Sequence, residues 1–302
     1  MSHLNNLSIV IVTFLTDKKT LLNCLNSIDQ NVNVLIVENS KKFKDREFFL
    51  NKFSNINIYC TGKNLGYGGG NNYGVRKTKT DFVLILNPDT ILDKNFFRNL
   101  ELVLKNKSFS LIGCQYSYDK VYTPGGFFNE IKNRNFKEGY NSHKNKNLIK
   151  VDWIVGCSML LNIKKIKSRH IFDENFFLYF EEYDFCKKLK NENQKVYLSK
   201  NLKVHHLGFK SSNLDIKNFK NESEKLRNWH YMWSSFFYYK KNYNHFYATY
   251  KLSDKLIKSF FKLIFFTIIF NKNNRNKYLY RFLGLTSSLL GKKSSYRGIY
   301  FH

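Results

Sequence analysis

Acidic residues are scarce in this sequence, and it has neither a cysteine pair motif nor a membrane-spanning run. Its 302 residues include 23 aspartates and glutamates against 50 lysines and arginines, for a formal net charge of +27. Such a cationic surface favours polyanionic partners: nucleic acids, anionic lipids or phosphorylated substrates. The hydrophobic content of 43% supports a full core, so a disordered chain is not expected.

The cysteines and the apolar segments narrow the location of the protein. Five cysteines stand far apart without a C-x-x-C motif, each in or beside an apolar segment. We therefore expect buried, reduced thiols in a reducing compartment. No apolar run approaches the roughly 20 residues of a membrane-spanning helix, and the N-terminal residues do not form a signal peptide. These features predict a cytoplasmic protein.

Apolar strand patterns alternate with helical patterns from the start of the chain. Strands are predicted for residues 7–14, 32–37, 56–59, 83–86 and 111–116, and helices for residues 21–28, 43–53 and 96–104. This order predicts a doubly wound, Rossmann-like α/β fold with a mainly parallel sheet and helices on both faces. Thr13, Glu38 and Asp89 lie at the ends of three of the strands. Because open α/β sheets bind ligands beyond the carboxyl ends of their strands, these side chains should line one cleft.

Asp89 follows a predicted strand in the chain. Pro88 ends that strand, since proline donates no hydrogen bond to a sheet. A carboxylate at a rigid strand end can hold a hard divalent cation, and the cation can hold a diphosphate. A turn aspartate that caps the next helix fits these residues equally well.

Two further segments are predicted to be loops. Residues 64–74 are rich in glycine, which allows close backbone approach to a ligand, and amides at the following helix start can bind phosphate. They form neither a dinucleotide fingerprint, because Asn71 and Tyr73 stand where glycine is needed, nor a P-loop. The alternative is a flexible loop that binds no ligand. Residues 129–150 are polar and are predicted to form a mobile loop over the cleft.

Five carboxylates lie within residues 173–184. If residues 181–190 are helical, Glu182 shares an apolar face with residues three, four and seven positions later. Burial there would raise its pKa and suit it to proton abstraction. Asp184 lies off that face. In the alternative, Glu181 and Asp184 pair with Lys187 and Lys188 on a solvated helix.

Two histidines follow the predicted strands at residues 196–198 and 202–204. His205 or His206 can complete a metal site or contact phosphate, and a structural role is equally compatible.

The last ninety residues change character. Residues 229–250 are aromatic with interspersed lysines, and residues 256–270 are nearly all apolar yet too short to span a bilayer. Because basic residues crowd both flanks, the pattern favours an interfacial helix on an anionic membrane. A helix packed on the catalytic domain or on a second subunit is the competing interpretation.

In combination these segments resemble the family 2 glycosyltransferases with the GT-A fold, especially the bacterial rhamnosyltransferase-like branch. The matching segments are residues 8–14, 37–40, 64–71, 86–89, 153–156, 172–184 and 205–208. The likeness covers roughly residues 7–212, and the joint order of the motifs is more specific than any single one. It implies a GT-A domain over residues 1–212 and a helical, aromatic, basic and membrane-associating extension over residues 213–302.

The resemblance also implies a reaction. A sugar, with rhamnose as one candidate, would pass from a UDP- or dTDP-type donor, with inversion, to a hydroxyl of a growing bacterial surface glycan such as capsule or O-antigen. The acceptor would be a glycan or lipid-linked, and the enzyme would lie on the inner face of the cytoplasmic membrane.

Roles carry over to this chain by position. Glu182 would be the catalytic base, and Asp89 with His205 or His206 would hold Mn²⁺ or Mg²⁺. The nucleotide-sugar contacts would be Thr13, Glu38, Asn64, Gly66, Gly68, Asn71 and Asn87. The acceptor or sugar contacts would be Trp153, Gly156, Glu181 and Asp184.

The chain departs from the usual pattern of that family. Glutamate replaces the usual aspartate at positions 38 and 182, His170 and Ile171 replace a glycine pair, and Asp89 is the only carboxylate of its motif. We therefore expect a weaker metal dependence than in relatives with two carboxylates there.

Two other function classes stay open. The basic, aromatic C-terminal region is typical of single-strand nucleic-acid binders, but carboxylates repel phosphates, so that function leaves residues 173–184 and Asp89 unexplained. A sugar-nucleotide binder without catalysis is the other alternative. We expect no nucleic-acid partner.

Overall fold

The computed structural model describes residues 3–105, 108–117, 124–139, 147–207 and 219–300. They divide into two compact units. The sheet unit comprises the described parts of Met1–Lys63, Gly70–Phe172 and Phe185–Leu214, and the helical unit those of Asn64–Gly69, Asp173–Asp184 and Asp215–His302. The division falls inside two helices, α3 (Gly66–Lys77) and α7 (Glu181–Asn191).

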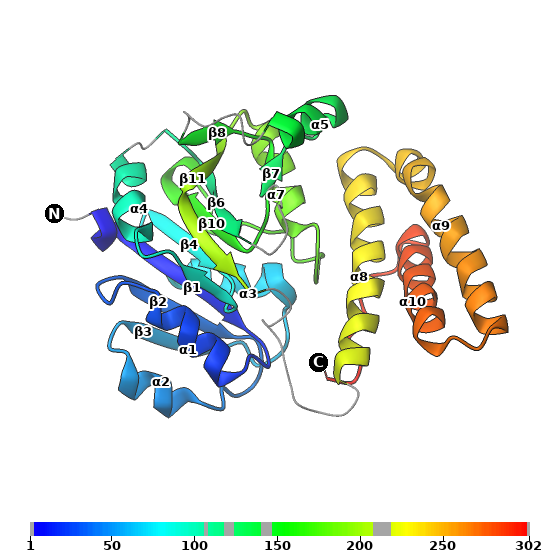
Figure 1. Cartoon of the computed structure of the whole chain (residues 1–302), viewed down its shortest axis with the longest axis horizontal. Helices are drawn as coiled ribbons and strands as arrows, with labels where there is room; N and C mark the ends of the chain where they lie inside the picture. Colours follow the sequence, from blue (N-terminus) through cyan, green and yellow to red (C-terminus); the bar gives the residue numbers. More distant parts are fainter. Residues whose placement is uncertain (1–2, 106–107, 118–123, 140–146, 208–218, 301–302) are drawn as a thin grey trace. The chain divides into compact units, whose positions relative to one another are not determined.

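The sheet unit is built on a mixed, mainly parallel sheet (Figure 1). Its nine strands among the described residues are β1 (Leu7–Thr13), β2 (Asn33–Glu38), β3 (Ile56–Cys60), β4 (Phe82–Leu86), β5 (Thr90–Leu92), β6 (Leu111–Ser117), β8 (Leu148–Lys150), β10 (Ser158–Asn162) and β11 (Val196–His206). The order is β3-β2-β1-β4-β10-β6-β11-β5, with β8 beside β11. Strands β5, β8 and β10 run antiparallel to their neighbours. A two-stranded sheet pairs β7 (Gly125–Gly126) with β9 (Trp153–Ile154).

Helices cover both faces of the sheet, as predicted. On one face, α1 (Lys18–Asn26), α2 (Arg46–Lys52) and α4 (Phe96–Lys105) bury side chains in one apolar cluster with β1, β2 and β4. The side chain of Asp17 starts α1 by accepting a hydrogen bond from the Thr20 amide, 2.9 Å away. Two shorter elements, η1 (His3–Asn6) and α6 (Ile163–Ile166), precede β1 and follow β10.

The glycine-rich segment is a helix and not a loop. Gly66 begins α3, and two of its glycines face the sheet. A Cβ on Gly70 would lie 2.8 Å from Val12 Cγ1, and one on Gly74 would lie 2.4 Å from Val10 Cγ1. Any side chain would push the helix off the sheet, so these glycines allow close packing of α3 on β1. The loop prediction was wrong here because glycine is as useful for close packing as for turns.

Two further predictions differ from the structure, one of a loop and one of a pair of strands. Residues 129–150 contain α5 (Glu130–Gly139) and β8, while residues 140–146 of that predicted loop lie outside the described residues. The two short strands predicted before the histidines are a single strand, β11, whose register shifts between Ser199 and Lys203. That irregularity explains why two strands were predicted.

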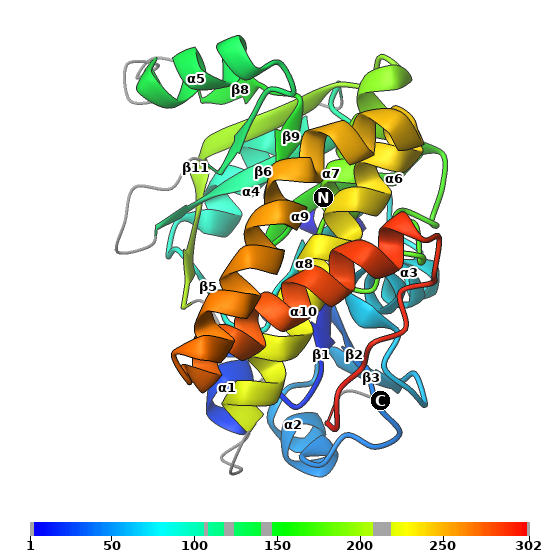
Figure 2. The same ribbon diagram turned by 90° about the vertical axis from the view of Figure 1, so that its right-hand side faces the viewer.

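The helical unit contains three long helices, which lie side by side in Figures 1 and 2: α8 (Phe219–Asn242), α9 (His245–Ile268) and α10 (Lys272–Leu289). Asn244 and Asn271 cap α9 and α10 by accepting hydrogen bonds from backbone amides three residues later. The shared apolar cluster consists of Met232, Phe236, Ala248, Leu252 and Leu285. Among the described residues, none of the helices combines the length and hydropathy that a membrane span needs.

Candidate functional site

The carboxyl ends of β1 and β2 bring the first two predicted site residues together. Thr13 and Glu38 are register partners in the two strands, and both are buried. The Thr13 hydroxyl donates to Glu38 Oε2 at 2.6 Å. Burial raises the pKa of Glu38, and the Thr13 hydrogen bond partly opposes that rise. A buried acceptor group at the open edge of a parallel sheet suits recognition of ribose or base donors.

The segment after β4 presents Asn87 and Asp89. The Asn87 amide donates to Cys157 O at 2.9 Å, and the Asn87 carbonyl accepts from the Thr90 hydroxyl at 2.6 Å. Asp89 is 1% exposed and is followed by β5, so it does not cap the next helix. The predicted metal-binding acid is therefore a buried carboxylate beyond the end of β4.

Strand pairing decides which histidine lies near Asp89. His206 pairs with Thr90 across β11 and β5, and the Leu207 amide donates to Asp89 O at 2.9 Å. His206 Nε2 consequently lies 3.3 Å from Asp89 Oδ1. The neighbouring His205 is exposed, because successive strand residues point to opposite faces.

The Asp89–His206 pair fits a divalent cation. The described residues contain no group of three or more His, Cys, Asp or Glu side chains that could hold a metal by themselves. A carboxylate oxygen and an imidazole nitrogen are nevertheless donors that Mn²⁺ accepts. A cation bound by two protein ligands has room for diphosphate oxygens and water.

A strained turn in the helical unit leads into α7. Tyr179 and Phe180 both adopt left-handed backbone angles, with φ of 69° and 70°. Such a conformation costs of order 1–3 kcal/mol for a residue other than glycine, and this kind of strain gathers at functional sites. The Phe180 ring lies 5.7 Å from that of Tyr231 and 5.5 Å from that of Tyr238, so α8 side chains support the turn.

Glu181 and Glu182 begin α7 in different surroundings. Glu181 is 1% exposed, and its Oε1 has no hydrogen-bond partner among the described residues. Glu182 is half-buried, yet enough protein surrounds its carboxyl that desolvation raises its pKa to about 7. Desolvation and the neighbouring Glu182 charge raise the pKa of Glu181 well above its ordinary value. Both carboxyl groups therefore ionise less readily than exposed glutamates do.

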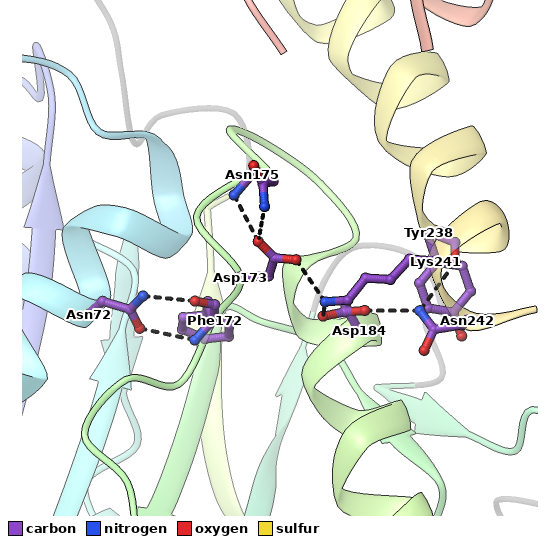
Figure 3. A network of polar contacts seen from close by, with 8 residues as sticks. All are labelled: Asn72, Phe172, Asp173, Asn175, Asp184, Tyr238, Lys241 and Asn242. Carbon is purple, nitrogen blue, oxygen red and sulfur yellow. Dashed lines mark hydrogen bonds and ion pairs between the residues drawn. The ribbon is translucent and has the colours of Figure 1, made fainter. Parts of the chain in front are cut away.

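The predicted phase of this helix needs correction. Asp184 was expected off the buried face, but it is 6% exposed, and Glu181 is more buried than Glu182. The partner of Asp184 is neither Lys187 nor Lys188. Lys241 Nζ of α8 lies 2.6 Å from Asp184 Oδ2 and 2.7 Å from Asp173 Oδ2 (Figure 3).

Asn242 completes this polar cluster. Its Nδ2 donates to Asp184 Oδ1 at 2.9 Å and to Tyr238 O at 3.1 Å. The amide and side chain of Asn175 donate to the other oxygen of Asp173 (Figure 3). Lys241 and Asn242 thereby tie the segment before α7 to the end of α8. Sequence reasoning missed both, because nothing local distinguishes Lys241 among the many lysines of this chain.

Asn72 is a further missed residue, in the sheet unit. Its Oδ1 accepts from the Ile171 and Phe172 amides, each at 2.9 Å, and its Nδ2 donates to Phe172 O at 2.8 Å (Figure 3). The side chain is fully buried. An amide among glycines on a sheet-facing helix was the available signal, since a buried amide needs partners.

The remaining predicted residues take local roles in the structure. Asn64 Oδ1 accepts from the Gly66 amide at 3.0 Å, ahead of α3. Gly68 and Asn71 are buried within that helix. Trp153 is buried and donates from Nε1 to Phe127 O at 3.2 Å, while Gly156 is buried between β9 and β10.

This chain matches the Glycosyl transferase family 2 profile over residues 8–167 and belongs to that family. A curated relative is the low-salt glycan biosynthesis hexosyltransferase Agl10 of Haloferax volcanii, which is 28% identical over 201 residues. The alignment covers 63% of this chain and 63% of that relative's length.

Solved structures share the fold at low identity. One is the mannosyltransferase PcManGT of Pyrobaculum calidifontis in complex with GDP-Man and Mn²⁺, with a TM-score of 0.56 at 10% sequence identity. The match covers 95% of this chain and 88% of that chain. GalNAc-T7 with UDP, GalNAc and Mn²⁺ gives 0.53 at 12% identity, with 77% of this chain and 50% of that chain covered. The fold is therefore GT-A, as predicted.

Proposed function

We propose that this chain is an inverting glycosyltransferase that moves a hexose from a nucleotide-diphosphate sugar to a hydroxyl group. The Asp89–His206 pair at the carboxyl edge of the sheet, in a chain of glycosyl transferase family 2, carries the proposal. A curated hexosyltransferase relative supports the transfer. Neighbours solved with GDP-Man or with UDP support a nucleotide-sugar donor.

The donor is assigned to the sheet unit. Thr13 and Glu38 would contact the base and ribose. Asn64, Gly66, Gly68, Asn71 and Asn87 remain the proposed contacts along the sugar nucleotide. A UDP or dTDP donor is proposed, and rhamnose is one candidate sugar.

Asp89 and His206 would hold Mn²⁺ or Mg²⁺, since His205 is exposed on the opposite strand face. When bound, the cation would neutralise charge on the departing diphosphate. Asp89 is the only acid of its motif, so a metal dependence weaker than with two carboxylates is part of the proposal.

Glu182 is the proposed general base. The residue is only half-buried, and its pKa of about 7 matches a base that works near neutral pH. The acceptor O–H proton would pass to Glu182 as the acceptor oxygen forms a bond to the anomeric carbon. The bond from that carbon to the diphosphate oxygen breaks on the opposite side, which inverts the configuration.

The other acidic and aromatic residues are assigned to the acceptor side. Trp153, Gly156 and Glu181 remain proposed acceptor or sugar contacts. Both oxygens of Asp184 are engaged by Lys241 and Asn242, so we assign Asp184 to positioning the segment that carries Glu182.

The proposed setting is the inner face of the cytoplasmic membrane, with a surface glycan such as capsule or O-antigen, or a lipid-linked chain, as acceptor. Residues 1–212 would form the GT-A domain and residues 213–302 the membrane-associating extension. The net charge of +27 supports an anionic surface as partner.

A thermal-shift panel of UDP-, dTDP- and GDP-sugars, followed by donor hydrolysis with and without Mn²⁺, tests this function. We expect one class of sugar nucleotide to raise the melting temperature and to be hydrolysed, because ligand affinity appears directly as stability. A shift without turnover would indicate a binder without catalysis. If no sugar nucleotide shifts melting while single-stranded nucleic acid does, the proposal is wrong.

A further inference from the structure

Helix α9 exposes a long apolar face, which is interrupted by Asp254 between Tyr250 and Ile257. Seven of its large apolar side chains are between 42% and 83% exposed, and their spacing of four, seven, four, three, one and three residues keeps them on one side of the helix. They are Phe246, Tyr250, Ile257, Phe261, Ile264, Phe265 and Ile268. Soluble surfaces rarely expose an apolar patch of this length, so this face is expected to have a partner.

The opposite side of α9 is firmly packed. Ala248 and Leu252 are buried in the cluster with Met232, Phe236 and Leu285. The helix is therefore held in place by α8 and α10, and the exposure of its other face does not come from a loosely attached end. The face spans about 33 Å at 1.5 Å per residue, too long for a single contact with a small ligand.

A row of lysines borders the apolar face. Lys251, Lys255, Lys258 and Lys262 follow one another at helical spacing along α9, whose single acidic residue, Asp254, lies 3.1 Å from Lys258 Nζ. Residues 245–302 contain eleven lysines and arginines against that one acid. An apolar face with a cationic border matches the boundary between acyl chains and anionic headgroups, where lysine stems lie along apolar surface and their charges reach the headgroups.

We propose that α9 lies in the plane of an anionic lipid bilayer and inserts this apolar face between the lipids. A second copy of the chain would bring two lysine rows together and repel, whereas anionic lipid attracts them. The inference deepens the membrane location proposed above, and it does not depend on the transfer reaction.

The test is flotation of the full chain with vesicles, without donor or acceptor. Vesicles of phosphatidylcholine with about 30% phosphatidylglycerol are compared with pure phosphatidylcholine. We compare wild type with Phe261→Gln/Phe265→Gln and with a matched control in the sheet unit, Leu102→Gln/Ile131→Gln, whose side chains are 59% and 71% exposed. The phenylalanine variant should bind the anionic vesicles at least about tenfold more weakly, because two aromatic rings that insert into the lipid are replaced by polar side chains.

Further measurements separate the outcomes. The control should bind as wild type does, both variants should keep the wild-type melting temperature, and wild-type binding should fall as salt rises. Equal binding of wild type and the phenylalanine variant would overturn the proposal. So would a wild-type dimer that the phenylalanine substitutions convert to a monomer, without vesicle binding. Transfer to a soluble acceptor without vesicles should be unchanged in that variant, so failure of the membrane proposal and failure of the function are distinguishable.

Discussion

At the scale of single residues, the two glutamates that begin α7 differ in burial. Glu181 is buried, and desolvation together with the neighbouring Glu182 charge raises its pKa well above the ordinary value. Glu182 is half-buried, and desolvation raises its pKa to about 7. Because a general base must reach the proton that it takes, the more open Glu182 is the proposed base.

Substitution by glutamine distinguishes the two. Glu182→Gln should lower kcat by about 10²–10⁴-fold, the usual contribution of a general base, and leave donor binding intact. Glu181→Gln should cost much less, because the buried Glu181 is assigned to contact and not to proton transfer. Steady-state kinetics with a donor-binding titration measure both. If Glu181→Gln is inactive and Glu182→Gln is normal, Glu181 is the base.

The pH profile provides a second readout. A base works in its ionised form, so kcat of the wild type should rise with pH through about 7, the raised pKa of Glu182. The acidic limb should persist in Glu181→Gln and disappear from the residual rate of Glu182→Gln. An unchanged limb in Glu182→Gln would assign it to another group.

The proposed metal ligands allow a matched comparison. Asp89→Asn should nearly abolish transfer without unfolding the protein. His206→Ala should weaken Mn²⁺ binding, and His205→Ala should leave it near wild type, because only His206 lies 3.3 Å from Asp89. Mn²⁺ binding followed by electron paramagnetic resonance checks this without activity. Near-normal turnover of Asp89→Asn with Mn²⁺ present, or equal effects of both histidines, would contradict the assignment.

At the scale of elements, the end of α8 fixes the segment that precedes α7. Lys241 contacts both Asp173 and Asp184 from α8, and the strained residues Tyr179 and Phe180 lie between those two aspartates in the chain. The helical unit thereby restrains the backbone that presents the two glutamates. Lys241 is a positioning residue in this arrangement.

Lys241→Met should destabilise the helical unit, because it leaves the nearly buried Asp184 carboxylate without its cation. Since the Lys241 side chain is 36% exposed, we expect the loss to be roughly 1–3 kcal/mol. Lys240→Met, at its exposed neighbour, is the control. Denaturant unfolding measures stability, and kcat should fall while donor binding persists. Adding Asp184→Asn to Lys241→Met should recover part of the stability, and no recovery would argue against the ion pair.

At the scale of the whole molecule, the C-terminal residues form part of the packing of the helical unit. Trp233 Nε1 donates to Lys292 O at 2.9 Å, and His230 Nε2 lies 2.7 Å from Tyr296 O. The end of the chain therefore contributes to the stability of α8.

Deletion of residues 251–302 should therefore damage folding as well as membrane binding. It removes Leu252 and Leu285 from the apolar cluster and leaves Met232 and Phe236 of α8 uncovered. We expect loss of helical circular dichroism beyond the deleted residues, or aggregation, whereas Phe261→Gln/Phe265→Gln should keep the wild-type spectrum. An undamaged α8 in the deletion variant would contradict this packing.

The sequence by itself determined the central strands and the residues at their ends. Strands buried on both faces are near-continuous apolar runs, and β1, β2 and β4 have that local pattern. The positions of Thr13, Glu38 and Asp89 at or after strand ends were predictable for the same reason, and parallel strands bring their carboxyl ends to one edge.

Only the tertiary structure decided how other segments are used. That Gly70 and Gly74 pack a helix on β1 depends on contacts with distant Val12 and Val10. That His206 and not His205 lies near Asp89 depends on the register of β11 with β5, and the ion pair of Asp184 depends on Lys241 in another helix. Local sequence sets strand and helix preference within a few residues, but strand register and helix phase minimise free energy over contacts between segments far apart in the chain.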